Sequence, residues 1–471
     1  MFLNKIFGII KKDFIDEGWK DMNIIIVGAG KVGETLIQNF IQEKHDIVVV
    51  DTNAKTVENI VNRYDVMGVV GSCLERNVLS DAGVSTVDFL VSCTSRDEVN
   101  ILSCVLGKKL GAKRTIARVR DPEYFKEVDS MKEVLGLDYA FNPELHTAIE
   151  IAHVLKFPFA KNVEGFVHNR ATMAEIEIVE GNPIINKTLK DIAKEYGNNV
   201  LIGAVQRGKE WFIPRGDFIV EEGDLIHVIS SENELITFCK KIKMFKRRAK
   251  NVFIIGGGKI AYYLSEKILS AGSNVKIIES SKERAEELAS SLPKSIVIRG
   301  DGTDQELLDE ENLKNADACV VLTGMDEENV IISLYAKQKG VGKVVTKVDR
   351  TSIINMVERL GLDTVVSPKD VIANHIVRFI RAHQAETGNG INTMYKLDDK
   401  VEALEFTVRE NFVKQGIPLK KLSLRKNVLI GGIVRGGEFI LPGGETTMLA
   451  GDRVIVVTAS KQITDLTQIL R

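Results

Sequence analysis

The sequence predicts an α/β protein in which two doubly wound parallel-sheet domains are each followed by a small α+β domain. Three observations support this prediction. A glycine turn lies between an apolar strand and an amphipathic helix near residue 28, the same pattern recurs 228 residues later, and a second repeated segment follows each copy. The chain therefore has the order A-B-A′-B′, which indicates a tandem duplication.

The first glycine turn, Gly28-x-Gly30-x-x-Gly33, follows an apolar run, and a second run at 47–50 ends in Asp51. Strand, glycine turn, helix, strand and acid in this order form the dinucleotide-binding fingerprint of Rossmann-like domains. The helix start attracts phosphates through its free N–H groups and its dipole. Asp51 can accept hydrogen bonds from ribose and repels a 2′-phosphate. The pattern therefore favours NAD(H), or another adenine nucleotide with a free ribose, over NADP.

Residues 252–281 repeat this fingerprint. The third glycine is replaced by Ala261, which still permits close packing of helix and strand. Thr94–Asn100, T-S-R-D-E-V-N, resembles Thr323–Asn329, T-G-M-D-E-E-N. The other aligned pairs are Gly28 with Gly256, Gly30 with Gly258, Lys31 with Lys259, Asp51 with Glu279, and Arg118 with Lys347.

Apolar runs alternate with helix-period stretches through each A module, which predicts parallel strands with right-handed crossovers. We expect the strand order 3-2-1-4-5-6. Pro143 and Pro368 each open a further helix, at 142–157 and 367–386, because proline suits a first helical turn. Little room remains for these helices on their own sheets, so we expect them to cross to a neighbouring module. The strands expected in the first module are 24–27, 47–50, 66–70, 88–92, 115–118 and 138–141.

Each B module carries the segment N-V-L-I-G, at Asn199 and again at Asn427, and ends in a Gly-Asp pair before a last strand. We expect a strand at 173–179, a helix at 189–196 and a hairpin at 200–213 in the first copy, and a strand at 403–408 in the second. The predicted boundaries are 1–21 for an N-terminal extension, 22–141 and 246–366 for the Rossmann-like domains, 142–160 and 367–387 for the crossover helices, and 161–245 and 388–471 for the small domains.

Composition argues against several classes of protein. Net charge is −2, so bulk electrostatics predict no nucleic-acid partner. The five cysteines are scattered, which fits a reducing compartment, and no apolar run approaches the roughly 18 residues of a membrane span. We expect 1–21 to be a disordered terminus, with a mis-assigned start or an amphipathic tail as alternatives. The basic run Lys240–Lys250 is expected to be a solvated linker, with a phosphate or membrane-surface contact as the alternative.

Polar side chains follow the fourth and fifth strands of the first module. Thr94 and Ser95 lie at the carboxyl edge, where open α/β sheets bind ligands, and their hydroxyls can donate to phosphate or ribose. Arg118 ends the fifth strand and can bind a phosphate through two N–H groups. The alternative for Arg118 is a surface salt bridge to Asp121 or Glu123. Asp97 and the residue after it are expected to be first-turn charges that complement a helix dipole.

These motifs resemble the TrkA family, the cytoplasmic nucleotide-binding regulatory subunits of Trk-type potassium uptake systems, which are built from RCK (regulator of potassium conductance) domains. The resemblance covers about residues 22–471 and rests on the paired glycine loops, the T-x-x-D-E-x-N stretches and the N-V-L-I-G segments. It implies a ring of RCK domains on the inner face of the cell membrane, beneath a TrkH-type potassium-transport subunit. Because one chain carries two modules, a homotetramer would supply eight. Nucleotide binding would change the shape of the ring and so gate the pore.

The resemblance also implies the ligand-binding residues. Candidate ligands are NAD, NADH, ATP and ADP. Two departures weaken the second site, because Ala261 replaces the third glycine and Gly324 stands where the first copy has Ser95. The implied first site comprises Gly28, Ala29, Gly30, Lys31, Val32, Asp51, Thr94, Ser95 and Arg118, and the implied second site comprises Gly256, Gly257, Gly258, Lys259, Ile260 and Glu279.

The alternative class is an NAD-dependent oxidoreductase. Hydride transfer needs a proton-moving group beside the nicotinamide and a closed substrate pocket. Two Tyr-x-x-x-Lys matches exist, but Tyr263 lies on the helix after a glycine loop, and Tyr335 lacks a serine partner. The seven histidines show no metal-ligand spacing. The sequence therefore favours a regulatory protein without a catalytic residue.

Overall fold

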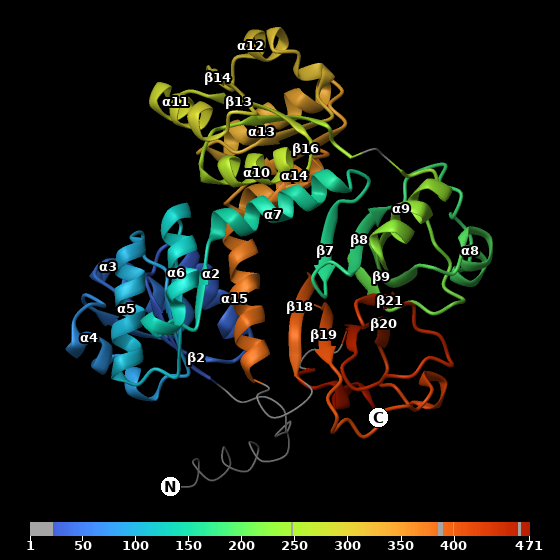
Figure 1. Cartoon of the computed structure of the whole chain (residues 1–471), viewed down its shortest axis with the longest axis horizontal. Helices are drawn as coiled ribbons and strands as arrows, with labels where there is room; N and C mark the ends of the chain where they lie inside the picture. The colour runs from blue at the N-terminus through green and yellow to red at the C-terminus, as the bar shows by residue number, and fades with distance from the viewer. Residues whose placement is uncertain (1–21, 246–247, 363, 385–389, 399, 460–462) are drawn as a thin grey trace.

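The computed structural model describes residues 22–245, 248–362, 364–384, 390–398, 400–459 and 463–471. The predicted extension 1–21 and part of the basic run after Lys240 lie outside these ranges. Four sheets are present, two with six strands and two with five. Figure 1 shows the first Rossmann-like domain in blue, the second in yellow, and the two small domains stacked beside them.

The first six-stranded sheet is entirely parallel and has the order β3-β2-β1-β4-β5-β6, which confirms the predicted topology. Its strands alternate with helices because buried β-branched runs alternate with amphipathic segments. The strands are β1 (Asn23–Val27), β2 (Asp46–Asp51), β3 (Met67–Val70), β4 (Phe89–Ser92), β5 (Arg114–Arg118) and β6 (Tyr139–Phe141), and the helices are α2 (Lys31–Gln42), α3 (Ala54–Tyr64), α4 (Arg76–Asp81), α5 (Asp97–Leu110) and α6 (Pro122–Leu135).

The second parallel sheet repeats this order as β14-β13-β12-β15-β16-β17. The duplication inferred from the sequence is therefore a duplication of structure. The strands are β12 (Asn251–Ile255), β13 (Asn274–Glu279), β14 (Ile296–Arg299), β15 (Ala318–Val321), β16 (Lys343–Lys347) and β17 (Val365–Val366), and the helices are α10 (Lys259–Ser270), α11 (Lys282–Ser291), α12 (Gln305–Glu310), α13 (Asp326–Gln338) and α14 (Thr351–Arg359).

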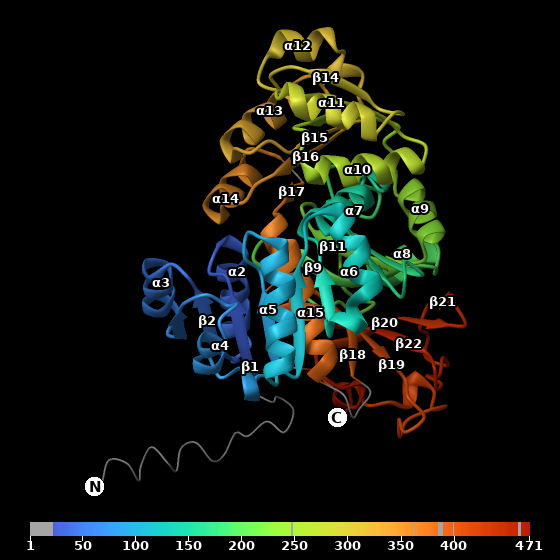
Figure 2. The same ribbon diagram turned by 60° about the vertical axis from the view of Figure 1, so that its left-hand side comes forward.

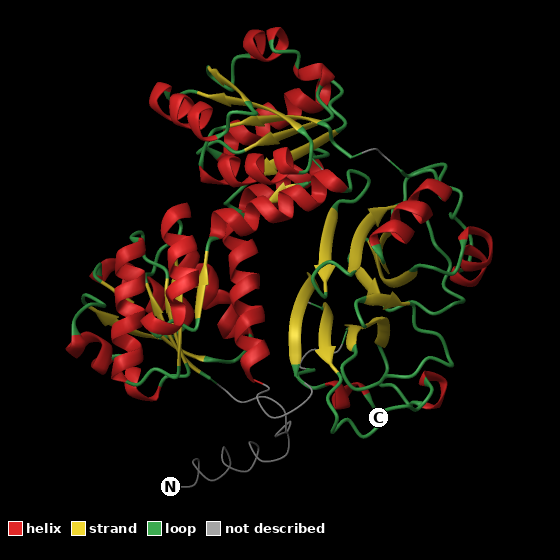
Figure 3. Ribbon diagram, viewed as in Figure 1, coloured by secondary structure: helices red, strands yellow, loops and turns green. Residues whose placement is uncertain are grey.

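The two small domains each contain an antiparallel sheet, and these sheets lie one above the other in Figure 3. Their facing sides share one apolar cluster, and Gly203 and Gly431 make the close approach possible. A Cβ on either glycine would lie 3.0 or 2.7 Å from Cδ1 of Ile229. The first sheet contains β7 (Asn162–Phe166), β8 (Ala171–Glu177), β9 (Leu201–Arg207), β10 (Glu210–Phe212) and β11 (Leu225–Ser230), flanked by α8 (Leu189–Tyr196) and α9 (Glu232–Lys241), and the second contains β18 (Ile391–Asp398), β19 (Val401–Thr407), β20 (Val428–Arg435), β21 (Glu438–Ile440) and β22 (Arg453–Thr458).

Two helices leave their own domains. α7 (Pro143–Lys156) lies against α10 of the second Rossmann-like domain, and α15 (Pro368–Gln384) lies against α2 of the first (Figures 1 and 2). Apolar side chains in both interfaces are continuous with the domain cores. The Asn142 side chain caps α7 by accepting a hydrogen bond from Leu145 N at 3.0 Å. Within the described residues, no helix has both the length and the apolar content needed to cross a lipid bilayer.

A buried group of three charges fixes α15 in place. The Arg381 guanidinium donates to Glu43, which directly follows α2, at 2.5 and 3.0 Å and to Glu402 of β19 at 3.2 Å. All three side chains are less than a tenth exposed. This arrangement joins the first Rossmann-like domain, the crossover helix and the second small domain.

Candidate functional site

A cavity of about 840 Å³ lies at the carboxyl edge of the first parallel sheet. This is the edge at which open α/β sheets bind ligands. Of the residues predicted for the first site, only Ala29 does not line the cavity. The lining residues of that set are Gly28, Gly30, Lys31, Val32, Asp51, Thr94, Ser95 and Arg118. The structure therefore brings eight of the nine predicted residues to one cavity.

Each of the three positions in the first glycine loop requires the absence of a side chain for a different reason. Gly28 has a φ of 96°, and a Cβ there would lie 2.9 Å from Thr94 N. A Cβ on Gly33 would lie only 2.0 Å from the carbonyl oxygen of Gly28. At Gly30 a Cβ would meet no protein atom within 4 Å, so the free space there opens towards the cavity. This is the position at which a pyrophosphate can approach the backbone.

Asp51 is held rigidly at the end of β2. Its Oδ2 accepts a hydrogen bond from Ala29 N at 2.8 Å, and its Oδ1 accepts one from Asn53 N at 2.9 Å. Ala29 therefore acts through its backbone N–H and positions the acid. A carboxylate can accept more than one hydrogen bond on each oxygen, so Asp51 keeps acceptor capacity for a ribose.

The T-x-x-D-E-x-N motif ties together two strand ends. The Asn100 side chain accepts from Thr94 N and Thr94 Oγ1 at 2.8 and 2.7 Å and donates to the Arg118 carbonyl at 3.0 Å. The Thr94 hydroxyl is therefore committed within the protein. Asp97 is in the first turn of α5, as expected, but its Oδ2 also accepts from Arg120 N and Asp121 N, both at 2.8 Å. Asn100 was not among the predicted site residues, although the sequence shows an asparagine at this position in both copies of the motif.

Arg118 carries an unpaired donor at the cavity. Its Nε is buried and has no hydrogen-bond partner among the described residues. Burial lowers the pKa of the guanidinium, although Glu144 beside it acts in the opposite direction. The alternative of an ion pair with Asp121 or Glu123 is not formed within the described chain. A buried N–H that lacks an acceptor is costly, and a ligand phosphate at this position would supply one.

The second Rossmann-like domain closes the other side of the same cavity. It contributes Ile260, Lys347 and Asp349, and the start of the crossover helix α15 adds Pro368 and Lys369. Two ion pairs cross between the domains, and each joins a glycine-loop lysine to an aspartate that follows the fifth strand of the other domain. The Lys31 Nζ to Asp349 Oδ2 distance is 3.8 Å, and the Lys259 Nζ to Asp121 Oδ2 distance is 3.9 Å. The site is thus built from both halves of the chain.

The second glycine loop makes the same backbone contact with its acid as the first loop does, but its neighbouring side chains differ. Gly257 N donates to Glu279 Oε2 at 2.6 Å, as Ala29 N does to Asp51. Arg284, which aligns with Thr56 of the first copy, donates from Nε to the Gly257 carbonyl at 2.7 Å. Of the six residues predicted for a second site, Ile260 lines the first cavity. Gly256, Gly257, Gly258, Lys259 and Glu279 are not among the residues that line it.

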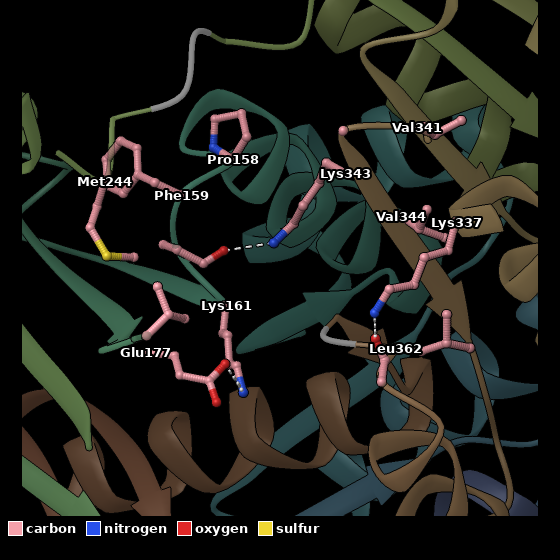
Figure 4. Close-up of a pocket in the computed structure, with 14 residues that line it drawn as sticks. Pro158, Phe159, Lys161, Glu177, Met244, Lys337, Val341, Lys343, Val344 and Leu362 are labelled. Carbon is pink, nitrogen blue, oxygen red and sulfur yellow. Dashed lines mark hydrogen bonds and ion pairs between the residues drawn. The ribbon is translucent and has the colours of Figure 1, made fainter. Parts of the chain in front are cut away.

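A smaller cavity of about 270 Å³ lies where the first small domain meets the second Rossmann-like domain (Figure 4). Three lysines line it, which could suggest an anion site. Lys343 Nζ donates to the Ala160 carbonyl at 2.7 Å, Lys337 donates to the Gly361 carbonyl, and Lys161 pairs with Glu177 at 3.0 Å. Because all three ammonium groups have protein partners, we interpret this cavity as part of the interface between the two domains and not as an anion site.

Comparison with known proteins identifies the class. The model of the TrkA-N domain matches residues 24–143 and 252–368, and that of the TrkA-C domain matches 173–243 and 404–471. The solved structure of the GsuK channel bound to NAD superimposes with a TM-score of 0.61 at 18% identity, covering 98% of this chain and 81% of that chain. The GsuK RCK domain gives 0.61 at 17% identity, covering 97% of both chains. The protein is therefore a tandem arrangement of TrkA-N and TrkA-C domains with the fold of RCK proteins.

Relatives of known name define the family more narrowly. The Trk system potassium uptake protein TrkA homolog of Archaeoglobus fulgidus is 33% identical over 450 residues, which cover 96% of this chain and 100% of the relative. The Trk system potassium uptake protein TrkA of Haemophilus influenzae is 30% identical, covering 94% of this chain and 96% of the relative. The chain belongs to the TrkA family.

Proposed function

We propose that this protein is a nucleotide-responsive regulatory subunit of a potassium uptake system. NAD(H), ATP or ADP binds in the first cavity and changes the angle between the two Rossmann-like domains, and this change gates a TrkH-type membrane subunit. The observation that carries the proposal is that both domains line the cavity next to the first glycine loop. A ligand anchored by Asp51 and Arg118 would extend towards Lys347 of the other domain and Lys369 at the start of α15.

Such a ligand can act as a switch only if it binds one domain arrangement more tightly than another. Lys347 would supply that difference, because it lies near the first glycine loop and attracts negative charge there only while the domains stay close. A coupling of about 1–3 kcal/mol is typical of such regulation. The names of the relatives support a place in potassium uptake, and the GsuK channel bound to NAD shows that this fold accepts a dinucleotide elsewhere.

A catalytic role is not favoured by the position of the tyrosines. Tyr263 accepts a hydrogen bond from Asn142 Nδ2 at 2.8 Å, so it belongs to the contact between α10 and α7. Tyr335 donates to the Gln305 carbonyl at 3.3 Å. Neither residue is among those lining the cavity. We propose that the nucleotide is bound and released unchanged.

The first test is a calorimetric titration of the purified protein with NAD, NADH, ATP and ADP. Removing the carboxylate in Asp51→Ala is expected to weaken binding roughly 10- to 100-fold, because hydrogen bonds to a charged group contribute about 1.5–3 kcal/mol. The matched variant Glu279→Ala should leave this affinity unchanged, because Glu279 does not line the first cavity. Equal losses in both variants, or no loss in either, would contradict the assignment.

We further propose that the protein assembles into a ring, as a homotetramer of eight modules. Each Rossmann-like domain exposes apolar side chains at aligned positions of the sequence. In the first domain Leu102 and Met131 are 54% and 45% exposed, and in the second Ile331 and Leu360 are 62% and 46% exposed. Apolar side chains that are exposed at matching positions of both domains are typical of surfaces through which identical chains associate.

Charges on these surfaces are expected to break the assembly. The double variant Leu102→Glu/Ile331→Glu should sediment as a smaller species than the unmodified protein, because burying an unpaired carboxylate in an apolar interface is costly. Val179→Glu is the control, since Val179 is similarly exposed at 52% but lies on a small domain. An unchanged sedimentation coefficient in the double variant would place the interface elsewhere.

A further inference from the structure

Two carboxyl groups and one guanidinium lie around the same cavity where the crossover helices meet the small domains. Glu164 Oε1 of β7 lies 3.9 Å from Arg378 Nη2 of α15, and the Arg378 guanidinium lies 3.5 Å from the Tyr395 ring centroid. Glu150 of α7 faces the same pair and forms no hydrogen bond or ion pair with the described residues. All three charged side chains are only partly exposed, and with two acids beside one base, one negative charge lacks a partner whenever both acids are ionised.

A polar cavity of about 480 Å³ adjoins this cluster. Three buried donors line it without a hydrogen-bond partner among the described residues, namely Arg378 Nε, Thr364 Oγ1 and Ser367 Oγ. A polar space of this size can hold water. Protons can therefore pass between the carboxyl pair and solvent.

The pair of Glu150 and Glu164 titrates near neutral pH, because the pKa of each carboxyl is raised, that of Glu164 chiefly by burial. Burial, and then the Glu164 carboxylate, raises the pKa of Glu150 to about 8, although Arg378 acts in the opposite direction. Burial lowers the pKa of His146 to about 4 and that of His375 well below its usual value, so both rings are uncharged near pH 7. The other charged side chains around the cavity and the cluster are Lys161 before β7, Glu175 of β8, Asp370 of α15 and Lys396 of β18.

Both helices that carry this cluster also line the nucleotide cavity. α7 begins there with Pro143 and Glu144, and Glu150 follows about 9 Å further along the helix. α15 begins there with Pro368 and Lys369, and Arg378 follows about 14 Å along. A displacement at one end of either rigid helix therefore reaches the other end.

We propose that Glu150 and Glu164 form a proton-binding site that regulates the nucleotide cavity. With one proton bound, α7 and α15 stay packed against β7 and β18, and both domains line the cavity. Loss of the proton leaves two carboxylates beside Arg378, their repulsion separates the helices from the strands, and nucleotide affinity falls. This inference rests on the proposed function, since it adds a regulator to the same nucleotide site.

The direction of the pH effect follows from the pKa of Glu150. The packed arrangement raises this pKa above its ordinary value of 4.5, so it binds the proton more tightly than a hydrated arrangement does. The contribution to stability is present in full below pH 4.5 and is lost as the pH rises through about 8. Nucleotide affinity is therefore expected to decrease between neutral and alkaline pH.

Calorimetric titration with ATP and with NADH between pH 7 and pH 9.5 tests this expectation. The unmodified protein should lose about 5- to 100-fold in affinity over this range, as is typical of coupled sites. Glu150→Gln, which mimics the protonated acid, should keep the neutral-pH affinity throughout, and Glu164→Gln should move the decrease to another pH. Glu222→Gln, at an exposed position, should behave as the unmodified protein. Equal pH dependence in the Glu150→Gln variant and the unmodified protein would overturn the proposal.

Infrared spectroscopy of the nucleotide-free protein separates this proposal from the proposed function. Between pH 7 and pH 9.5 the absorption of a protonated carboxylic acid should disappear as the pH rises through about 8, and it should be absent from Glu150→Gln throughout this range. If no nucleotide binds at any pH, the proposed function is wrong. The infrared titration then still decides whether Glu150 holds a proton, and a missing band refutes the proton site.

Discussion

Replacing Arg381 with alanine is expected to lower the free energy of unfolding by about 3–5 kcal/mol, because it leaves the buried carboxylates of Glu43 and Glu402 without their shared cation. Both acids are almost fully buried and accept hydrogen bonds from the same guanidinium. Chemical denaturation followed by circular dichroism measures the change. Hydrogen exchange should also increase in α2, because Glu43, the acid that Arg381 binds, directly follows this helix.

The control for this experiment is Arg425→Ala, which removes an exposed arginine whose Nε donates to the Leu470 carbonyl at 3.2 Å. Surface changes of this kind usually alter stability by less than about 0.5 kcal/mol. Replacing the group together, as Arg381→Met with Glu43→Gln and Glu402→Gln, should recover much of the loss, since no buried charge then remains unpaired. A loss below about 1 kcal/mol in Arg381→Ala would show that water reaches the two acids.

Gly33→Ala is expected to weaken nucleotide binding about 100-fold while the domain stays folded. The new methyl group would lie 2.0 Å from the Gly28 carbonyl oxygen, so the glycine loop must move away from the helix start. The phosphates would then lose charge-assisted hydrogen bonds of about 1.5–3 kcal/mol each. Calorimetric titration gives the affinity, and circular dichroism verifies the fold.

Ala261→Gly supplies the comparison for Gly33→Ala. Ala261 occupies the same aligned position in the second loop, where the backbone accommodates its methyl group in a fully buried site. Removing that methyl group should not change nucleotide affinity at the first cavity. A Gly33→Ala variant with unchanged affinity would mean that the nucleotide binds away from the first loop.

The parallel sheets could be predicted because each strand is a short buried apolar run and each helix is amphipathic. Sequence patterns missed β7 and β18, the outer strands of the small-domain sheets. Asn162–Phe166 contains a charge and a glycine in five residues, so its composition does not favour a strand. Its extended form depends on antiparallel pairing with β8, which only the folded chain supplies.

The first half of the site was predictable and the second half was not. Glycine spacing and the acid after β2 indicate a nucleotide because local geometry alone decides their role. Lys347, Asp349 and Lys369 reach the same cavity only because α7 and α15 hold the two domains face to face. Ile260 belongs to the second glycine loop, so the sequence assigned it to the second site. The packing of the helices instead places it at the first cavity.

The exchange of crossover helices has a consequence for synthesis on the ribosome. α2 is completed early in translation, but α15, which covers its apolar face, begins only at Pro368. The apolar face of α7 likewise has no partner until α10 has been synthesised. The apolar face of α2 therefore stays exposed to solvent until most of the second half has been made, whereas that of α7 is covered once α10 is complete, and exposed apolar surfaces recruit chaperones or neighbouring chains.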